Sequence, residues 1–185
     1  MKDYFWLLFF FSVSGFGAEY VNPIGKFTLQ YDETVWEVIP PKPEVAGAEV
    51  DQTMAEKTLA TLQRKKADDK YHARFSVVSD SLKKFRGKGK SDLDAYKEHA
   101  VEFLKSQQFY ILSQETVRLP GVETPVIEVV GNQRNFGLTF RQLIFVKGDS
   151  AYLLTAASRK EKYDEYLPDL KKVAESFHFL KETKR

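Results

Sequence analysis

The sequence predicts an α+β fold in which helices cover an antiparallel sheet. Segments with the two-residue hydrophobic period of strands come in groups, and each group is followed by a segment with helical periodicity, so strands and helices are segregated along the chain. The strand expected at Leu138–Lys147 is mostly apolar on both faces, which favours an interior position with a layer on either side. Together these observations predict a layered α/β/α sandwich.

The segment from Leu138 onwards has the clearest pattern. The strand Leu138–Lys147, the turn-forming residues 148–150 and the strand Ala151–Ser158 predict an antiparallel hairpin, because glycine tolerates the positive φ of a tight turn. Apolar residues then recur at intervals of three and four, as on one face of a helix. Because proline is tolerated in the first helical turn and costly further in, we expect a short turn at Glu161–Tyr166 and the main helix at Pro168–Phe177.

Earlier in the chain, strand-like segments surround one helix. The expected strands are Lys26–Tyr31, Val35–Ile39, Lys57–Gln63, Tyr71–Leu82, Phe109–Leu119 and Pro125–Gln133. Ser91 is expected to cap the helix, because its side chain can accept a hydrogen bond from the first turn, where Asp92 and Asp94 suit the helix dipole. The helix runs to about Gln107, and its inner face is expected to consist of Leu93, Tyr96, Ala100, Phe103, Leu104 and Gln107. Glu19–Ile24 is expected to be a short entry segment and Glu44–Glu56 a weakly patterned loop.

Residues Met1–Ala18 have the pattern of a secretory signal peptide. Their apolar run, Tyr4–Val13, is too short for a bilayer-spanning helix, which needs about twenty residues. Small residues follow the run, as they do before a cleavage site, and cleavage is expected after Gly17 or Ala18. The alternatives are an uncleaved anchor or a buried first strand.

The composition limits the compartment and the partners. The 185 residues suffice for one domain, expected at 19–180 and followed by the polar tail Lys181–Arg185. The net charge of +2, from 28 basic and 26 acidic residues, is too balanced to predict binding of nucleic acid. The chain has no cysteine, which excludes disulfides, thiolate metal ligands and a lipidated N-terminal cysteine. Because it also lacks an N-glycosylation sequon, we expect an exported bacterial protein, periplasmic or extracellular.

The sequence contains no recognisable catalytic or ligand-binding motif. His72, His99 and His178 lie far apart in the chain and lack the spacing of a metal site. There is no GxSxG nucleophile elbow, and the glycines of Gly87–Ser91 are too close together for a phosphate-binding loop. We therefore assign no catalytic, metal-binding or cofactor-binding residue, expect no cofactor, and expect that the protein is not an enzyme.

The strongest candidate for a binding site is a basic loop, which consists of Lys83, Lys84, Phe85, Arg86, Lys88 and Lys90. Like charges at such close spacing repel one another and extend a loop, which presents it to an acidic protein of the cell envelope or to anionic lipid headgroups. The alternative is that the loop is only a solvated connector.

Arg141 on the interior strand is a second candidate. If it is buried it needs an acidic partner, and a structural ion pair is the simpler explanation.

Three stretches carry a resemblance to a known family. Phe27–Trp36 has the form of an opening strand, a turn and a tryptophan, Ser91–Phe103 is a helix after Ser-Asp-Leu, and Arg141–Phe177 ends in a helix closed by Ser-Phe. In these features the chain resembles the PsbP-like superfamily, which includes the DcrB-like exported bacterial proteins and a nuclear-import factor that binds the GTPase Ran. The resemblance implies an α/β/α sandwich and action mainly by binding proteins. The role of PsbP beside an oxygen-evolving metal cluster is not implied, because the residues for it have no match here.

These expectations define one leading function and two alternatives. The leading prediction is an exported, non-enzymatic accessory or adaptor protein of the bacterial envelope that acts by protein–protein binding. The first alternative is a carrier of a small apolar ligand in a pocket between sheet and helices, which a cleft lined by Trp36, Phe75 and Tyr152 would favour. The second, a hydrolase, would need a histidine and a carboxylate to converge on a nucleophile.

Overall fold

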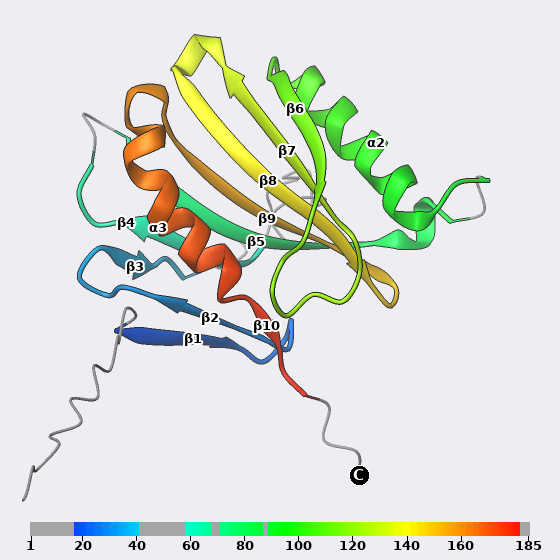
Figure 1. Ribbon diagram of the computed structural model, residues 1–185, viewed down its shortest axis with the longest axis horizontal. Coiled ribbons are helices and arrows are strands. Elements are labelled where there is room, and N and C mark those ends of the chain that lie inside the picture. Colours follow the sequence, from blue (N-terminus) through cyan, green and yellow to red (C-terminus); the bar gives the residue numbers. More distant parts are fainter. Residues whose placement is uncertain (1–16, 41–57, 68–70, 87–88, 182–185) are drawn as a thin grey trace, which may run out of the picture.

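The computed structural model describes residues 17–40, 58–67, 71–86 and 89–181. These residues form a seven-stranded sheet with an α-helix on each face, and a smaller three-stranded sheet (Figure 1). The strands are β1 (Ala18–Asn22), β2 (Phe27–Tyr31), β3 (Trp36–Val38), β4 (Thr58–Arg64), β5 (Arg74–Ser81), β6 (Tyr110–Val117), β7 (Val126–Gln133), β8 (Leu138–Lys147), β9 (Ser150–Arg159) and β10 (His178–Phe179). The helices are α2 (Asp92–Ser106) and α3 (Tyr163–Glu175), with the 3-10 turns η1 (Leu82–Lys84), η2 (Arg134–Phe136) and η3 (Lys160–Lys162). The predicted α+β architecture, an α/β/α sandwich, is confirmed.

The larger sheet has the strand order β3-β4-β5-β9-β8-β7-β6, and all of its neighbouring strands are antiparallel. Strand β8 lies in its interior. Leu143 and Phe145 of β8 pack on the side of α3, and Phe140 and Ile144 pack on the side of α2. The alternation of side chains along a strand therefore puts apolar residues into both layers, and the prediction of an interior strand is confirmed.

The β8–β9 hairpin is also confirmed, with a tighter turn than expected. Lys147 pairs with Ser150, so that Ser150 belongs to the strand and the turn consists of Gly148 and Asp149 alone. Gly148 has a φ of 59°, in the left-handed region that glycine adopts without strain. The turn stands at the edge of the basic loop and contributes to its geometry.

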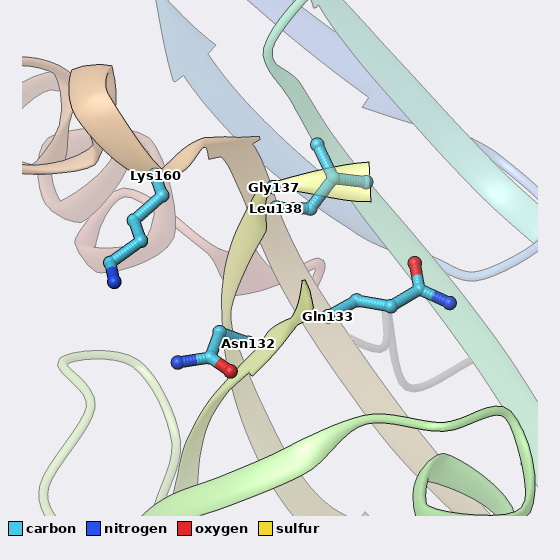
Figure 2. A pocket seen from close by; sticks show the side chains of 5 residues that line it. All are labelled: Asn132, Gln133, Gly137, Leu138 and Lys160. Atoms are coloured by element: carbon cyan, nitrogen blue, oxygen red, sulfur yellow. The ribbon is translucent and has the colours of Figure 1, made fainter. Parts of the chain in front are cut away.

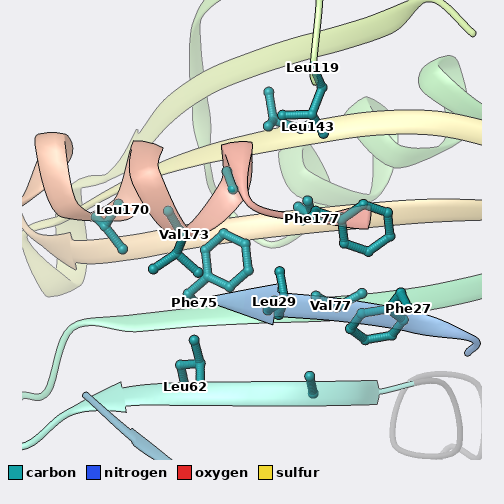
Figure 3. Packing of buried hydrophobic residues seen from close by; sticks show 14 of the residues in the cluster. Phe27, Leu29, Leu62, Phe75, Val77, Leu119, Leu143, Leu170, Val173 and Phe177 are labelled. Atoms are coloured by element: carbon teal, nitrogen blue, oxygen red, sulfur yellow. The ribbon is translucent and has the colours of Figure 1, made fainter. Parts of the chain in front are cut away.

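The larger of two apolar cores lies between the sheet and α3, and we call it the α3-side core (Figure 3). Helix α3 contributes Leu170 and Val173, and the large sheet contributes Phe75. Strand β2 of the small sheet adds Phe27, whose ring stacks on that of Phe177 with 5.1 Å between centroids. The small sheet, in the order β1-β2-β10, thereby closes this core beside the helix.

The α2-side core lies on the opposite face and is smaller. Its buried residues are Leu82, Tyr96, Ala100, Val101, Leu104, Val129, Phe140, Ile144 and Ala151. Helix α2 covers β7 and β8, and the ring of Phe109 at its C-terminal end packs edge-on against Phe140 with 5.1 Å between centroids. No second sheet among the described residues extends this layer, so it depends on one helix.

Helix α2 begins as predicted, but its buried face differs from the predicted stripe. The Ser91 side chain accepts a hydrogen bond from the backbone N–H of Asp94 at 3.1 Å, which confirms the N-cap. Phe103 and Gln107 are exposed, whereas Val101 is buried in the α2-side core. The helix is therefore rotated so that Val101 faces the sheet. The spacing of apolar residues in the sequence predicts that one side of the helix is buried, but it does not fix this rotation to within one residue.

The second helix begins earlier than predicted. Helix α3 runs from Tyr163 to Glu175 and contains Pro168, so the expected break before Pro168 was wrong. A proline at this position cannot donate to the carbonyl of Asp164, four residues back. Pro168 is exposed, and its side of the helix faces water, which can satisfy that carbonyl. The packing of Tyr166 and Leu170 into the α3-side core offsets the lost helical bond.

Two short strands were missed. Residues Ala18–Asn22 form β1 where only an entry segment was expected, and His178–Phe179 form β10, both paired with β2. Strand β1 forms a local hairpin with β2, whereas β10 reaches β2 from the other end of the described chain, which a two-residue segment does not indicate. Strand β5 is also shorter than predicted, beginning at Arg74. The predicted leader up to residue 16, the segment Glu44–Glu56 and the tail after Lys181 lie outside the described residues.

Candidate functional site

The basic loop begins in a well-anchored turn. Strand β5 ends at Ser81, whose hydroxyl accepts a hydrogen bond from the N–H of Lys83 and so caps η1. Leu82 is fully buried in the α2-side core, and its N–H donates to the carbonyl of Asp149 at 2.9 Å. Lys83 and Lys84 follow directly and are both exposed. The turn therefore holds the two lysines at the surface at a fixed place.

Arg86 clamps the loop to two neighbouring segments. Its guanidinium lies 2.7 Å from the carboxylate of Asp149 in the β8–β9 turn and 3.2 Å from that of Asp92 at the start of α2. It also donates to the carbonyl of Gly148 at 3.1 Å. The two carboxylates raise the pKa of Arg86 above its usual value. The positive charge of Arg86 is thus compensated by two carboxylates of the same chain.

Phe85 and Lys90 are also engaged by the fold. The ring of Phe85 lies 5.1 Å from that of Tyr96 and 4.9 Å from that of His99, which ties the loop to α2. Lys90 pairs with Glu98 at 2.6 Å. Lys88 lies outside the described residues. Of the six predicted residues, Lys83 and Lys84 are therefore the exposed cations that have no ion pair within the described part of the chain.

Arg141, the second predicted candidate, forms an ion pair with Glu128 of the neighbouring strand β7. The two side chains are 17% and 15% exposed, so the prediction that a buried Arg141 needs an acidic partner is confirmed. Burial raises the pKa of the Tyr163 phenol, at the start of α3, to about 12. Arg141 lowers this pKa and Glu128 raises it through electrostatic interaction. The pair and the phenol form a polar patch beside the first turn of α3.

The three residues named for a ligand cleft do not line one. Trp36 and Phe75 are each 1% exposed and belong to the α3-side core. Tyr152 stacks on Phe145 at 5.6 Å between ring centroids and meets Phe179 edge-on at 5.0 Å. Side chains fill the space where an apolar ligand was expected, and no observation on these residues favours the carrier alternative.

Two concave surfaces lie elsewhere. A pocket of about 260 Å³ is formed where the ends of β7 and β8 meet η3, and its lining residues are Asn132, Gln133, Gly137, Leu138 and Lys160 (Figure 2). The Asn132 Oδ1 atom is buried there without a hydrogen-bond partner among the described residues. The second is a groove of about 500 Å³ along β6, lined by Lys105 and residues 109–114. Neither was predicted, since each depends on how distant strand ends come together.

The histidines are engaged separately. The His72 Nδ1 atom lies 2.6 Å from the carbonyl of Arg64, His99 packs against Phe85, and His178 lies on β10. The described residues contain no group of three or more histidine, aspartate or glutamate side chains placed to hold a metal ion. None of the helices in the described ranges combines the length and apolar content that a membrane crossing requires.

The architecture places the chain in a known structural class. No protein-family model matches the chain, and no curated protein sequence matches it significantly. The solution structure of CyanoP, the cyanobacterial PsbP of Synechocystis, superposes with a TM-score of 0.58 at 11% identity over 88% of this chain and 91% of that chain. This likeness shows the fold alone, and the chain has a PsbP-like fold, as its sequence predicts.

Two further structures are less similar. A Pseudomonas aeruginosa protein of unknown function has a TM-score of 0.49 at 10% identity and covers 85% of this chain and 92% of its own. A Bacteroides thetaiotaomicron protein has a TM-score of 0.49 at 11% identity over 91% of this chain and 50% of that chain. None of the three structures is described as an enzyme.

Proposed function

We propose that this protein is an exported, non-enzymatic accessory protein that acts by binding another protein of the bacterial envelope. The contact is made by the basic loop, and Lys83 and Lys84 are its recognition residues. The partner presents carboxylates to these two ammonium groups, because complementary charge guides association and fixes orientation.

The observation that carries the proposal is the clamp at Arg86. By bridging Asp92 and Asp149, this residue fixes the turn that bears Lys83 and Lys84 before any partner arrives. A preformed surface loses less conformational freedom on binding than a loop that has to become ordered. Within one short segment, Arg86 holds the loop in place, whereas Lys83 and Lys84 are left for a partner.

The test is the capture of a partner by charge reversal at two positions. The full-length protein and the variant with Lys83→Glu and Lys84→Glu are used to pull down proteins from envelope extract. The matched control carries Lys171→Glu and Lys172→Glu, an equally charged change at two adjacent exposed lysines of α3. A partner should bind wild type and control, be lost from the loop variant, and bind less tightly in high salt, which screens exposed charges.

Two outcomes would overturn the proposal. Equal loss of the partner from both variants would show that net charge matters and the loop does not. Binding to vesicles that contain anionic lipid, lost only in the loop variant and without a captured protein, would assign the lysines to a membrane surface. Arg86 is left unchanged in this design, because replacing it would release the clamp and confuse loss of contact with loss of order.

A further inference from the structure

Strand β6 forms one edge of the seven-stranded sheet, and among the described strands it pairs only with β7. In an edge strand, alternate backbone N–H and C=O groups point away from the sheet, where an additional extended segment can pair with them. Strand β6 has eight residues, whereas β3 at the opposite edge has three. The longer pairing edge is therefore on the side of β6.

The groove along β6 has the dimensions of a short extended segment. Its lining combines Lys105 in the last turn of α2, Phe109, and five consecutive residues of the strand, Tyr110–Gln114. Five residues of a strand extend about 16 Å. Phe109 packs edge-on against Phe140 of the α2-side core, which anchors the floor of the groove.

Apolar side chains gather at the groove end of this edge, whereas Glu115, the charged residue of β6, lies beyond the groove. Leu112 is 62% exposed and Tyr110 is 49% exposed, and Phe103 on the adjacent helix α2 is 38% exposed. Helix α2 and β6 are direct neighbours (Figure 1). Exposed apolar residues that gather at an edge and are flanked by polar ones are typical of interaction surfaces.

A bulge in β6 distinguishes between two occupants. Ile111 pairs with Gly131 and Ser113 with Val130, so Leu112 is the additional residue of a β-bulge. A bulge twists an edge and disfavours pairing with a second long strand, as would be needed to join two copies of this chain along β6. Residues 113–117 pair regularly with β7, so the strand beyond the bulge keeps an extended edge long enough for a short segment.

Charge indicates the chemistry of that segment. Lys105 is the one charged residue among the described residues that line the groove, and it is exposed. A carboxylate in the bound segment would meet this ammonium group, whereas a basic residue would be repelled. The backbone edge supplies affinity and the side chains supply selectivity, as in other cases of strand addition.

We propose that β6 binds an extended peptide segment of a partner protein by strand addition, with an apolar residue on Leu112 and a carboxylate beside Lys105. This inference rests on the proposed function, because it gives the accessory protein a second docking surface. The basic loop precedes α2 and the groove lies at its C-terminal end, and the 15 residues of the helix separate them by about 22 Å. The two proposed surfaces thus lie at opposite ends of α2.

The test uses the blocked six-residue peptide TVTEVT and amide NMR spectra of the full-length protein. Shifts should concentrate in residues 110–117, and the outward-facing N–H groups of β6 should exchange more slowly with solvent. Leu112→Asp should weaken binding about tenfold or more, which corresponds to about 1.4 kcal/mol. The matched control is Ile24→Asp on the β1–β2 turn, where an equally apolar side chain is 84% exposed, and it should bind normally.

Two further peptides decide the mechanism. TPTEPT lacks two N–H donors and should not bind, and equal binding would exclude strand addition. TVTKVT should bind less tightly than TVTEVT to the wild type, and the order should reverse in Lys105→Glu. An unchanged order would remove Lys105 from the proposal.

The remaining outcomes separate the two surfaces. The variant with Lys83→Glu and Lys84→Glu should bind TVTEVT normally, so failure of the basic loop leaves this test intact. Shifts in η1 instead of β6, or no shifts at millimolar peptide, would overturn the inference. A dimer that Leu112→Asp converts to a monomer would also overturn it, since a second copy would then occupy the edge.

Discussion

The two faces of the seven-stranded sheet differ in how they are closed. On one face, α3 and the small sheet together bury Phe27 and Phe177 completely. On the other, α2 is the one covering element among the described residues, and it leaves Phe103 at the surface. On the α3 side, β10 near the end of the chain pairs with β2 near its beginning. Both proposed docking surfaces lie on the other side, at the two ends of α2. If the proposed surfaces bind partners, recognition depends on the layer that is less completely closed.

The largest expected effect compares one leucine from each layer. Leu170→Ala removes a side chain that is 1% exposed in the α3-side core, and Leu104→Ala removes one that is 9% exposed in the α2-side core. We expect losses of about 3–4 kcal/mol for Leu170→Ala and about 2 kcal/mol for Leu104→Ala, because the cost rises with the cavity left behind. Urea unfolding of the two variants measures both losses, provided that the slope with denaturant is unchanged. Equal losses would show that the two layers support the fold alike.

A smaller effect is expected when an ion pair is broken on each face. Glu128→Gln leaves Arg141, 17% exposed, without a counter-charge, and should cost about 2 kcal/mol, somewhat less than for a fully buried pair. Glu98→Gln breaks the pair with Lys90, whose side chains are about half exposed, and should cost less than about 1 kcal/mol. Thermal unfolding at low and high salt distinguishes them, because only the exposed pair is screened. A salt-sensitive loss at Glu128 would show that this pair is open to solvent.

The sequence predicts the middle of this fold well and its margins poorly. The hairpin of β8 and β9 and the cap at Ser91 follow from local patterns, since a period of two and a hydroxyl before a helix act within a few residues. Strand β10 pairs with β2 across the length of the chain, and no local signal reports such pairing. Pro168 was given too much weight, because the packing of a helical face can override one lost hydrogen bond.

The candidate surfaces divide in the same way. The basic loop is visible as a run of charges, but its sequence does not reveal which cations the fold uses internally. Asp149 lies far from Arg86 in the chain, and only the β8–β9 turn brings it to the guanidinium. The groove at β6 was missed altogether, because being an edge strand is a property of the sheet order and not of residues 110–117 themselves.

The smallest expected effect appears only in alkaline solution and compares one tyrosine from each layer. Burial raises the pKa of Tyr163 to about 12, and burial together with the negative charge of Asp80 raises that of Tyr96 further. The unfolded chain releases these protons near pH 10 while the folded protein retains them, so the unfolded state binds fewer protons and stability falls as the pH rises above about 10. Below that pH the contribution is constant.

Tyr96→Phe and Tyr163→Phe should therefore each reduce the slope of unfolding free energy against pH between about 10 and 11.5. The reduction should be larger for Tyr96→Phe, because Asp80 opposes ionisation of Tyr96 whereas Arg141 favours that of Tyr163. Urea unfolding at a series of pH values measures the slope, with tyrosinate absorbance as an independent record of ionisation. An equal slope in wild type and Tyr96→Phe would mean that water reaches this phenol. The α2 layer, which has the smaller core, would then also be open at the ring that supports Phe85 and the basic loop.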